Sequence, residues 1–356
     1  MTKRSTVFSI AVIVIGIVLM TFSLVSCGFN FKRLDSKDYV TNTHEITESF
    51  NGISIVSDTA DITIVPTDSE NASVVAFDRK KMTHEVSVKN GNLTIEIDDE
   101  RKWYDHVNLF SFSNPAITVY LPLSEYGALS IDTDTSDVTI EKGFTFGGID
   151  IKLSTGDVRC HSSSSDFIKI DADTSDVFVS DISAKDVSIS LSTGDVDLNR
   201  CTFASINSRT STGDQSASAL SIENDFTVEV STGDTNIKDV DCKSFTSIGS
   251  TGEISLKNFT ATETLSIERR SGDVDLECCT AGYLSVKTST GDVDFDRSDA
   301  GEIYAKTSTG DVEGTLLTSK IFITSTNTGK VRVPSSTEGG KCEITTDTGD
   351  IEITVP

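Results

Sequence analysis

The chain has 356 residues, of which 37% are hydrophobic and 24% are charged, with 24 glycines against only five prolines. Its 55 acidic and 30 basic side chains give a formal net charge of −25, which repels the phosphate backbone and excludes a nucleic-acid partner. The apolar content is high enough to build a core, so the acidic charge is not that of a disordered tail.

Residues 1–30 are predicted to be a membrane segment. Lys3 and Arg4 precede an uncharged stretch whose apolar part covers 19 residues from Val7 to Val25, long enough to cross a bilayer as one helix. This length favours an uncleaved anchor. The alternative is a lipoprotein signal, because Leu24-Val25-Ser26-Cys27 is similar to a lipobox, in which Cys27 is lipidated after cleavage. Both predict a chain tethered to the cell membrane, single-pass or lipid-anchored, with its C-terminal part extracytoplasmic.

Residues 31–128 are expected to form irregular N-terminal coils and a cap. A segment from Ile53 to Ile64 has the inward apolar spacing of one coil, with Ala60 at its corner. A segment from Val86 to Ile95, across Asn90-Gly91-Asn92, is interpreted as a second coil, and Ile117, Val119 and Leu121 supply a further strand. Between them, an insertion from Asp98 to Pro115 carries Trp103, Tyr104, Phe110 and Phe112. We interpret this insertion as an aromatic cap; a partner-binding loop is the alternative.

Residues 129–356 repeat a Ser/Thr-Thr-Gly-Asp-Val motif every 19 or 20 residues. The glycine position is occupied in order by Ser136, Gly156, Ser175, Gly194, Gly213, Gly233, Gly252, Gly272, Gly291, Gly310, Gly329 and Gly349. Seven residues before it, every copy has an apolar side chain, from Leu129 and Ile149 to Phe322 and Cys342. Five before and two after it, most copies are again apolar, and polar residues alternate between them. This period of two predicts strands on either side of a Thr-Gly-Asp corner.

A strand with one buried face needs a neighbour, so the repeats are expected to stack. The predicted fold is all-β: a right-handed parallel β-solenoid (β-helix) of about 12–15 coils with 19–20 residues per coil, preceded by one N-terminal transmembrane or signal helix. Twelve coils spaced about 4.8 Å apart would make a rod of about 58 Å.

The acidic residue after each glycine is the candidate site with chemistry. Eleven of twelve copies are acidic, Lys330 being the exception, and stacked carboxylates at this spacing repel by about 1 kcal/mol per pair in water. The favoured interpretation is structural, with each carboxylate accepting backbone N–H groups of its own turn. The alternative is a Ca²⁺ ladder, for which the candidate ligands are Asp157, Asp176, Asp195, Asp214, Asp234, Asp273, Asp292 and Asp311.

Enzymatic activity is not expected. The coils are nearly uniform in length, so no long insertion walls a cleft, and no nucleophile–base pair, phosphate-binding loop or cofactor motif is recognisable. Arg269-Arg270 replaces the usual Thr-Ser, and we expect the guanidinium to lie along the acidic ladder. The seven cysteines are an odd number without Cys-x-x-Cys spacing, and most of them read as small apolar core residues.

The combination resembles a known bacterial family. It comprises the membrane segment, Cys27-Gly28-Phe29-Asn30-Phe31, Phe50-Asn51-Gly52-Ile53-Ser54-Ile55, Ile117-Thr118-Val119-Tyr120-Leu121-Pro122 and the Ser-Thr-Gly-Asp-Val turns. These features are similar to the putative-adhesin domain of unknown function that is common in Gram-positive bacteria. The resemblance implies a non-enzymatic, cell-surface interaction protein that binds an envelope or host-surface ligand. An envelope-stress sensor is the alternative, and a polysaccharide-active enzyme on a β-helix is the least favoured.

Overall fold

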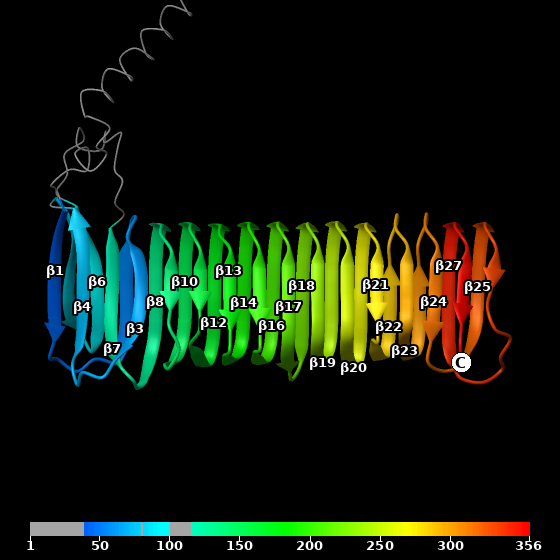
Figure 1. The fold of residues 1–356 in the computed structure, drawn as a ribbon, viewed down its shortest axis with the longest axis horizontal. Coiled ribbons are helices and arrows are strands. Elements are labelled where there is room, and N and C mark those ends of the chain that lie inside the picture. Colours follow the sequence, from blue (N-terminus) through cyan, green and yellow to red (C-terminus); the bar gives the residue numbers. More distant parts are fainter. Residues whose placement is uncertain (1–38, 80, 100–114) are drawn as a thin grey trace, which may run out of the picture.

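A computed structural model describes residues 39–79, 81–99 and 115–356, in which the regular elements are all β-strands. They join in one parallel β-solenoid, seen as a straight rod in Figure 1. Within these ranges no helix is long and apolar enough to cross a membrane. The expected membrane segment, Cys27 and most of the aromatic insertion lie outside the described residues.

The strands follow the chain in the order β1 (Tyr39–Ile46), β2 (Gly52–Ser57), β3 (Asp61–Thr67), β4 (Ala72–Arg79), β5 (Met82–Lys89), β6 (Asn92–Asp99), β7 (Ala116–Pro122), β8 (Glu125–Thr135), β9 (Val138–Ile140), β10 (Thr145–Thr155), β11 (Val158–Cys160), β12 (Ser163–Thr174), β13 (Val177–Ser180), β14 (Ser183–Thr193), β15 (Val196–Asn199), β16 (Thr202–Thr212), β17 (Gln215–Ile222), β18 (Asp225–Thr232), β19 (Thr235–Thr251), β20 (Ile254–Ser271), β21 (Val274–Glu277), β22 (Thr280–Lys287), β23 (Val293–Lys306), β24 (Val312–Leu316), β25 (Lys320–Thr328), β26 (Val331–Arg332), β27 (Gly340–Thr348) and β28 (Ile351–Thr354).

Successive coils stack in register, as the columns of the sequence predict. Val187 of β14 pairs with Ile206 of β16, and Val196 of β15 pairs with Gln215 of β17, both in parallel. Each coil therefore places its motif directly over the motif of its neighbour. The repeat spacing predicts this arrangement because a shift by one residue would turn every apolar side chain outward.

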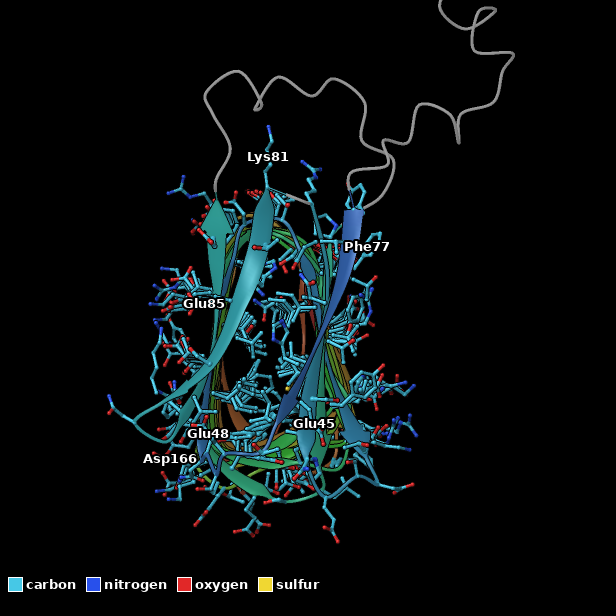
Figure 2. All side chains as sticks on the ribbon, turned by 90° about the vertical axis from the view of Figure 1, so that its left-hand side faces the viewer. Glu45, Glu48, Phe77, Lys81, Glu85 and Asp166 are labelled. Carbon is cyan, nitrogen blue, oxygen red and sulfur yellow. The ribbon has the colours of Figure 1, made fainter. Side chains whose placement is uncertain are left out.

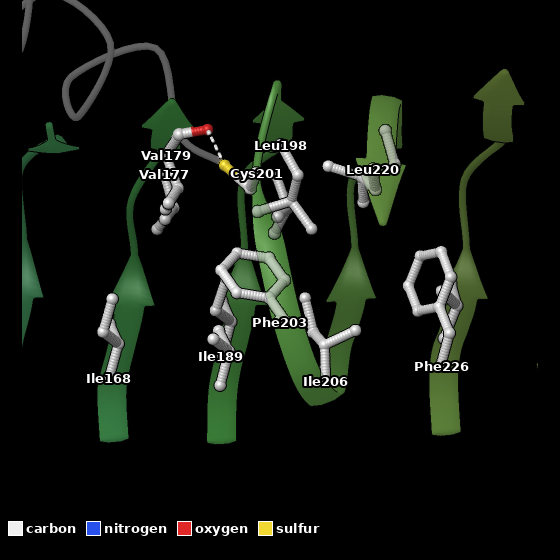
Figure 3. Packing of buried hydrophobic residues seen from close by; sticks show 14 of the residues in the cluster. Ile168, Val177, Val179, Ile189, Leu198, Cys201, Phe203, Ile206, Leu220 and Phe226 are labelled. Carbon is white, nitrogen blue, oxygen red and sulfur yellow. Dashed lines mark hydrogen bonds between the residues drawn. The ribbon is translucent and has the colours of Figure 1, made fainter. Parts of the chain in front are cut away.

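The core is the narrow space inside the coils, which forms the bore of the rod. The residues seven before the corner are buried throughout the middle of the rod, and Figure 3 shows three of them, Ile168, Ile206 and Phe226. Ile189, also drawn there, is buried five residues before its corner. Phe226, Phe245 and Phe259 continue this packing, with neighbouring ring centroids 5.1 and 4.9 Å apart.

The cysteines Cys160, Cys201, Cys242, Cys279 and Cys342 are buried and free, as expected for small core residues. Cys201 Sγ, for example, lies 3.7 Å from the Val179 carbonyl oxygen (Figure 3). Each thiol therefore acts as a compact apolar filler inside the coils rather than as half of a crosslink.

The N-terminal end differs from the expectation in one respect. The coil of β2 and β3 stacks on β8 and β9 as predicted, with Ile53 opposite Leu129 and Ile62 opposite Val138. The segment from Val86 to Ile95 is not a coil, however, but an antiparallel hairpin of β5 and β6. The reason is the Asn90-Gly91 turn, in which both residues have positive φ (53° and 76°), since such a two-residue turn reverses the chain.

Antiparallel strands close this end of the rod. β4 pairs antiparallel with β7 and with β1, and β5 lies outside β6. Figure 2 looks onto this end, where Glu45 and Glu85 label the two walls. The parallel stack thus ends in a different strand direction at its N-terminal side.

The C-terminal coils do not stack in chain order, although the regular spacing predicts that they do. Cys342 of β27 pairs with Ile303 of β23 on one side and with Phe322 of β25 on the other. The last coil in the sequence is therefore inserted, and the coil of β25 and β26 is outermost at the right-hand end of Figure 1. The residues 333–339 give the chain enough length to turn back, and the shared columns let either coil fit either place.

Candidate functional site

The acidic column forms a ladder along one edge of the rod. The carboxylate Oδ1 of each aspartate accepts a hydrogen bond from the backbone N–H of the acidic residue in the next coil. Typical N···O distances are 2.7 Å from Asp214 N to Asp195 and 2.8 Å from Asp234 N to Asp214. The ladder continues at 2.7–3.4 Å through most of the stack, beginning at Asp61 and ending at Lys330.

The backbone explains why a carboxylate is needed at this place. At the corner, Gly213 N donates to the Thr232 carbonyl and Gln215 N donates to the Asp234 carbonyl of the next coil. The N–H between them finds its acceptor in the side chain of the preceding coil. The structural interpretation is therefore right in kind but wrong in detail, because the acceptor serves the next coil rather than its own turn.

The corner glycines allow the coils to approach this closely. Gly213, Gly233, Gly252 and Gly272 have φ between +128° and +141°, and a Cβ on any of them would overlap the carbonyl group of the preceding corner. Both the backbone angle and the space therefore demand glycine in this part of the ladder.

The order of the coils explains why the acidic column has a lysine, Lys330, at one position. Its N–H donates to Asp350 Oδ1 at 2.8 Å, and its own coil is the outermost of the stack. No further described coil follows that would need an acceptor from this position. The one basic residue of the column therefore stands where a carboxylate has no N–H to accept.

The Ca²⁺ alternative is not tested by this geometry. Among the residues that the structure describes, no group of three or more His, Cys, Asp or Glu side chains is arranged to hold a metal ion. Asp157, Asp176, Asp195, Asp214, Asp234, Asp273, Asp292 and Asp311 all lie in the ladder, each facing one neighbour above and one below. The calcium ladder stays a prediction.

A pair of substitutions separates the two interpretations. We expect Asp214→Ala to lower the free energy of unfolding by about 1 kcal/mol, since it leaves the Asp234 N–H without its acceptor. Asp214→Asn should be nearly neutral, because its amide oxygen can accept the same bond. Thermal unfolding of both variants, with and without millimolar Ca²⁺, measures these effects. If Ca²⁺ raises the Tm of the wild-type protein but not that of Asp214→Asn, the result would support the metal ladder instead.

A second acidic column stands two residues further along the chain. Asp275, Asp294 and Glu313 are paired in register on neighbouring coils. Partial burial, and then the charges of Glu313, Asp275, Asp292 and Asp273, raise the pKa of Asp294 to about 6. This column is a place of crowded negative charge on an otherwise regular surface.

We expect Asp294→Asn to raise the stability at pH 7 by less than about 1 kcal/mol, after allowance for solvent screening. A carboxyl whose pKa is raised in the folded protein destabilises it above that pKa, so the gain should disappear as the pH falls from about 6 to 4. Asp197→Asn is the control, since Asp197 has Phe178 and Ser216 rather than carboxylates beside it. Equal effects of both substitutions at all pH values would contradict the prediction.

A buried Ser–His–Asp arrangement joins the antiparallel strands β4 and β5 at the N-terminal end of the rod to β2 of the first coil. Ser57 Oγ of β2 lies 3.0 Å from His84 Nε2 of β5, and His84 Nδ1 lies 2.7 Å from Asp78 Oδ1 of β4. The His84 backbone N–H also donates to Asp78 Oδ2 at 3.1 Å. Sequence reasoning missed this nucleophile–base pair, because the three residues share no local motif. The available signal was a polar residue, Asp78, at an inward position of the alternating strand β4.

Burial limits what this arrangement can do. Ser57, His84 and Asp78 are 6%, 3% and 0% exposed, and the Ala60 backbone N–H also donates to Ser57 Oγ. The hydroxyl already has two polar neighbours inside the bore, and a substrate would have to open the cap to reach it. The geometry is that of a buried polar network that ties three strands together.

Arg269 does not lie along the acidic ladder, contrary to the expectation. Its side chain enters the bore and is 3% exposed, with Nη2 donating to Thr235 Oγ1 at 3.0 Å and to Ser247 Oγ at 2.9 Å. The absence of a side chain at Gly249 gives the guanidinium its room. Burial lowers the pKa of Arg269 to about 10, against the opposing effect of the Asp234 charge.

Comparison with known proteins places the chain in a family. The Toastrack DUF4097 family model matches residues 50–246 and 238–356. A comparison with curated proteins found no significant match.

Solved structures with a similar arrangement include two described as putative adhesins. One is from Bacteroides fragilis (13% identity, 90% of this chain and 98% of that chain, TM-score 0.31). The other is from Parabacteroides merdae (10% identity, 90% and 98%, TM-score 0.35). A third, described as a putative lipid binding protein from Parabacteroides distasonis, has 13% identity over 88% of this chain and 97% of that chain, with a TM-score of 0.27.

Proposed function

The chain belongs to the Toastrack DUF4097 family, and from this premise we propose that it is a non-enzymatic, adhesin-like interaction protein tethered to the cell membrane by its N-terminal segment. The apolar stretch from Val7 to Val25 supports the tether by its length. The regular rod supports a binding role, since it offers long flat walls rather than a deep cleft.

The observation that carries the proposal is a polar groove across the side of the rod. The outward side chains Ser216 and Ser218 of β17 are small, whereas Asp197 on one side and Lys238 and Lys257 on the other are longer. The result is an open hollow of about 430 Å³ that crosses several coils. Hydroxyl, amide and ammonium groups together suit hydrogen bonding to an extended polar chain, so we assign it to a polysaccharide of the envelope or of a host surface.

The test is to fill this groove with a large side chain at Ser216. Cells carrying Ser216→Trp in the full chain should attach to isolated cell-wall or host-surface polysaccharide as weakly as cells lacking the protein. Thr139→Trp is the matched control, since Thr139 is equally half-buried and occupies the same position of another coil. Attachment that is unchanged in both variants contradicts the proposal that this groove binds the polysaccharide. A deletion that alters envelope-stress reporters without altering attachment would favour the sensing function instead.

Serine chemistry is a second candidate function, favoured only by the distances among Ser57, His84 and Asp78. Their burial argues against it. A fluorophosphonate probe, which phosphonylates activated serines with loss of fluoride, should leave Ser57 unlabelled in the folded protein. Stoichiometric labelling of Ser57 that is lost in His84→Gln would reverse the proposal of a non-enzymatic protein.

A further inference from the structure

The C-terminal end of the rod has an open strand edge. β25 pairs in parallel with β27, and within the described ranges it has no ladder partner on its other side. It is nine residues long and stands at the right-hand end in Figure 1. A strand in this position offers a row of backbone N–H and C=O groups to another strand.

The chemistry of this edge is unlike that of the other coils. From Ile321 to Thr328 the strand carries no charge. Lys320, its first residue, is buried, with Nζ 2.6 Å from Asp299 Oδ1. Ile321 and Ile323 are 42% and 51% exposed, and Leu317 and Val331 of the same coil are also exposed. Natural edge strands are normally protected by charged side chains, so an uncharged, β-branched edge indicates a partner strand.

The opposite end of the rod has such protection. Its outer strands β1 and β5 carry the exposed Glu45 and Glu85, and they run antiparallel to the strands beneath them. The N-terminal end is therefore a poor partner for β25, and stacking of one rod head to tail on the next is disfavoured.

We propose that β25 pairs antiparallel with β25 of a second copy, so that two rods join at their C-terminal ends around a two-fold axis. With a net charge of −25, two copies repel each other, and this repulsion is weakest at an uncharged edge such as β25. The two-fold axis also brings the exposed Lys330 at the corner above β25 opposite the loop 333–339 below it, which carries the exposed Glu338 of the other copy. The contact occupies the open β25 edge of each copy, so the association stops at a dimer.

The direction of this dimer has a consequence that rests on the proposed function. β1, which follows residues 1–38 in the chain, lies at the far end from β25 (Figure 1). Joining the C-terminal ends places the two tethered ends at opposite ends of a rod of doubled length. Such a dimer links two membranes rather than two neighbours in one membrane, and adhesion between like cells follows from it.

The test is the association of the full chain in detergent, measured by sedimentation over micromolar to hundreds-of-micromolar concentrations. We expect a concentration-dependent dimer whose Kd is at least about tenfold weaker in Ile323→Lys, because the substitution places a positive charge on each strand of the uncharged pair. Ile248→Lys is the matched control: Ile248 is 46% exposed on the middle of the rod and should leave the dimer unchanged. Circular dichroism checks that both variants fold.

Cysteine crosslinking reports the strand direction. In single variants at Ile321, Ile323, Ser325 and Asn327, an antiparallel pair gives a self-disulfide only near the two-fold axis, whereas a parallel pair gives one at every position. A wild-type chain that stays monomeric throughout, or a dimer equally weakened by Ile248→Lys, overturns the proposal. Loss of attachment in Ser216→Trp with an intact dimer, or the reverse, shows which of the two proposals fails.

Discussion

Replacing Gly272 by alanine is expected to lower the free energy of unfolding by about 4 kcal/mol. The φ of Gly272 is +136°, a conformation that costs an alanine about 1–3 kcal/mol by itself. Its Cβ would also lie well under 3.0 Å from the Gly252 carbonyl oxygen, which belongs to a backbone held in the ladder and cannot easily move. The coils on both sides of the corner must therefore separate, with loss of the bond from Ile254 N to Asp273 O.

Chemical denaturation of the full chain, with hydrogen exchange along the coils, measures this effect. Gly91→Ala is the control, since Gly91 also has positive φ (+76°) but no atom within 4 Å of the added Cβ. That substitution should cost about 1 kcal/mol. Hydrogen exchange should quicken around residues 252–292 in the first variant and around the β5–β6 turn in the second. Equal losses of stability would show that backbone conformation, rather than the approach of neighbouring coils, requires glycine.

Replacing Arg269 by methionine is expected to raise the free energy of unfolding by about 2–3 kcal/mol. Burial lowers the Arg269 pKa from 12.5 to about 10. Since each pKa unit corresponds to about 1.4 kcal/mol, this shift disfavours the charged form in the folded protein by about 3 kcal/mol. Nε and Nη1 have no hydrogen-bond partner among the described residues, so the desolvated charge is incompletely compensated. Methionine fills the same space without a charge, and Thr235 and Ser247 keep hydroxyls that can turn to other acceptors.

The sign of the pH dependence follows from the lowered pKa. The unfolded chain holds the Arg269 proton more tightly, so the destabilisation is complete below pH about 10 and is lost as the pH rises toward 12.5. The gain from Arg269→Met should thus be constant between pH 6 and 9. Arg270→Met, at the exposed neighbouring position, should change stability by less than about 0.5 kcal/mol. A loss of stability in Arg269→Met alone would mean that its two hydrogen bonds outweigh the buried charge.

The inward columns show how far sequence reasoning reaches. The apolar residues at fixed distances from the corner predict the coil, its period and its buried face, and the register of Val187 with Ile206 confirms them. Arg269 shows where such reasoning ends. An arginine is expected outside, and only the vacancy beside Gly249 together with Thr235 and Ser247 lets it turn inward.

The candidate site was predicted in part. The acidic ladder is visible in the spacing. That the Asp214 carboxylate accepts from the Asp234 N–H of the next coil, rather than from its own turn, depends on the offset between neighbouring backbones. Ser57, Asp78 and His84 come together only because β4 and β5 fold antiparallel over the end of the bore. Three residues on three strands leave no spacing in the sequence that could reveal their contact.

The sequence by itself determined the solenoid, its period, its corners and its inward face, because a period of two combined with a constant repeat length admits one kind of stacking. Only the tertiary structure decided the order of the coils. All coils share the same columns, so β27 can stack on β23 as well as β25 could, and local pattern does not distinguish them. The loop 333–339 and the end position of Lys330 settle that order, and with it which strand is left open at the end of the rod.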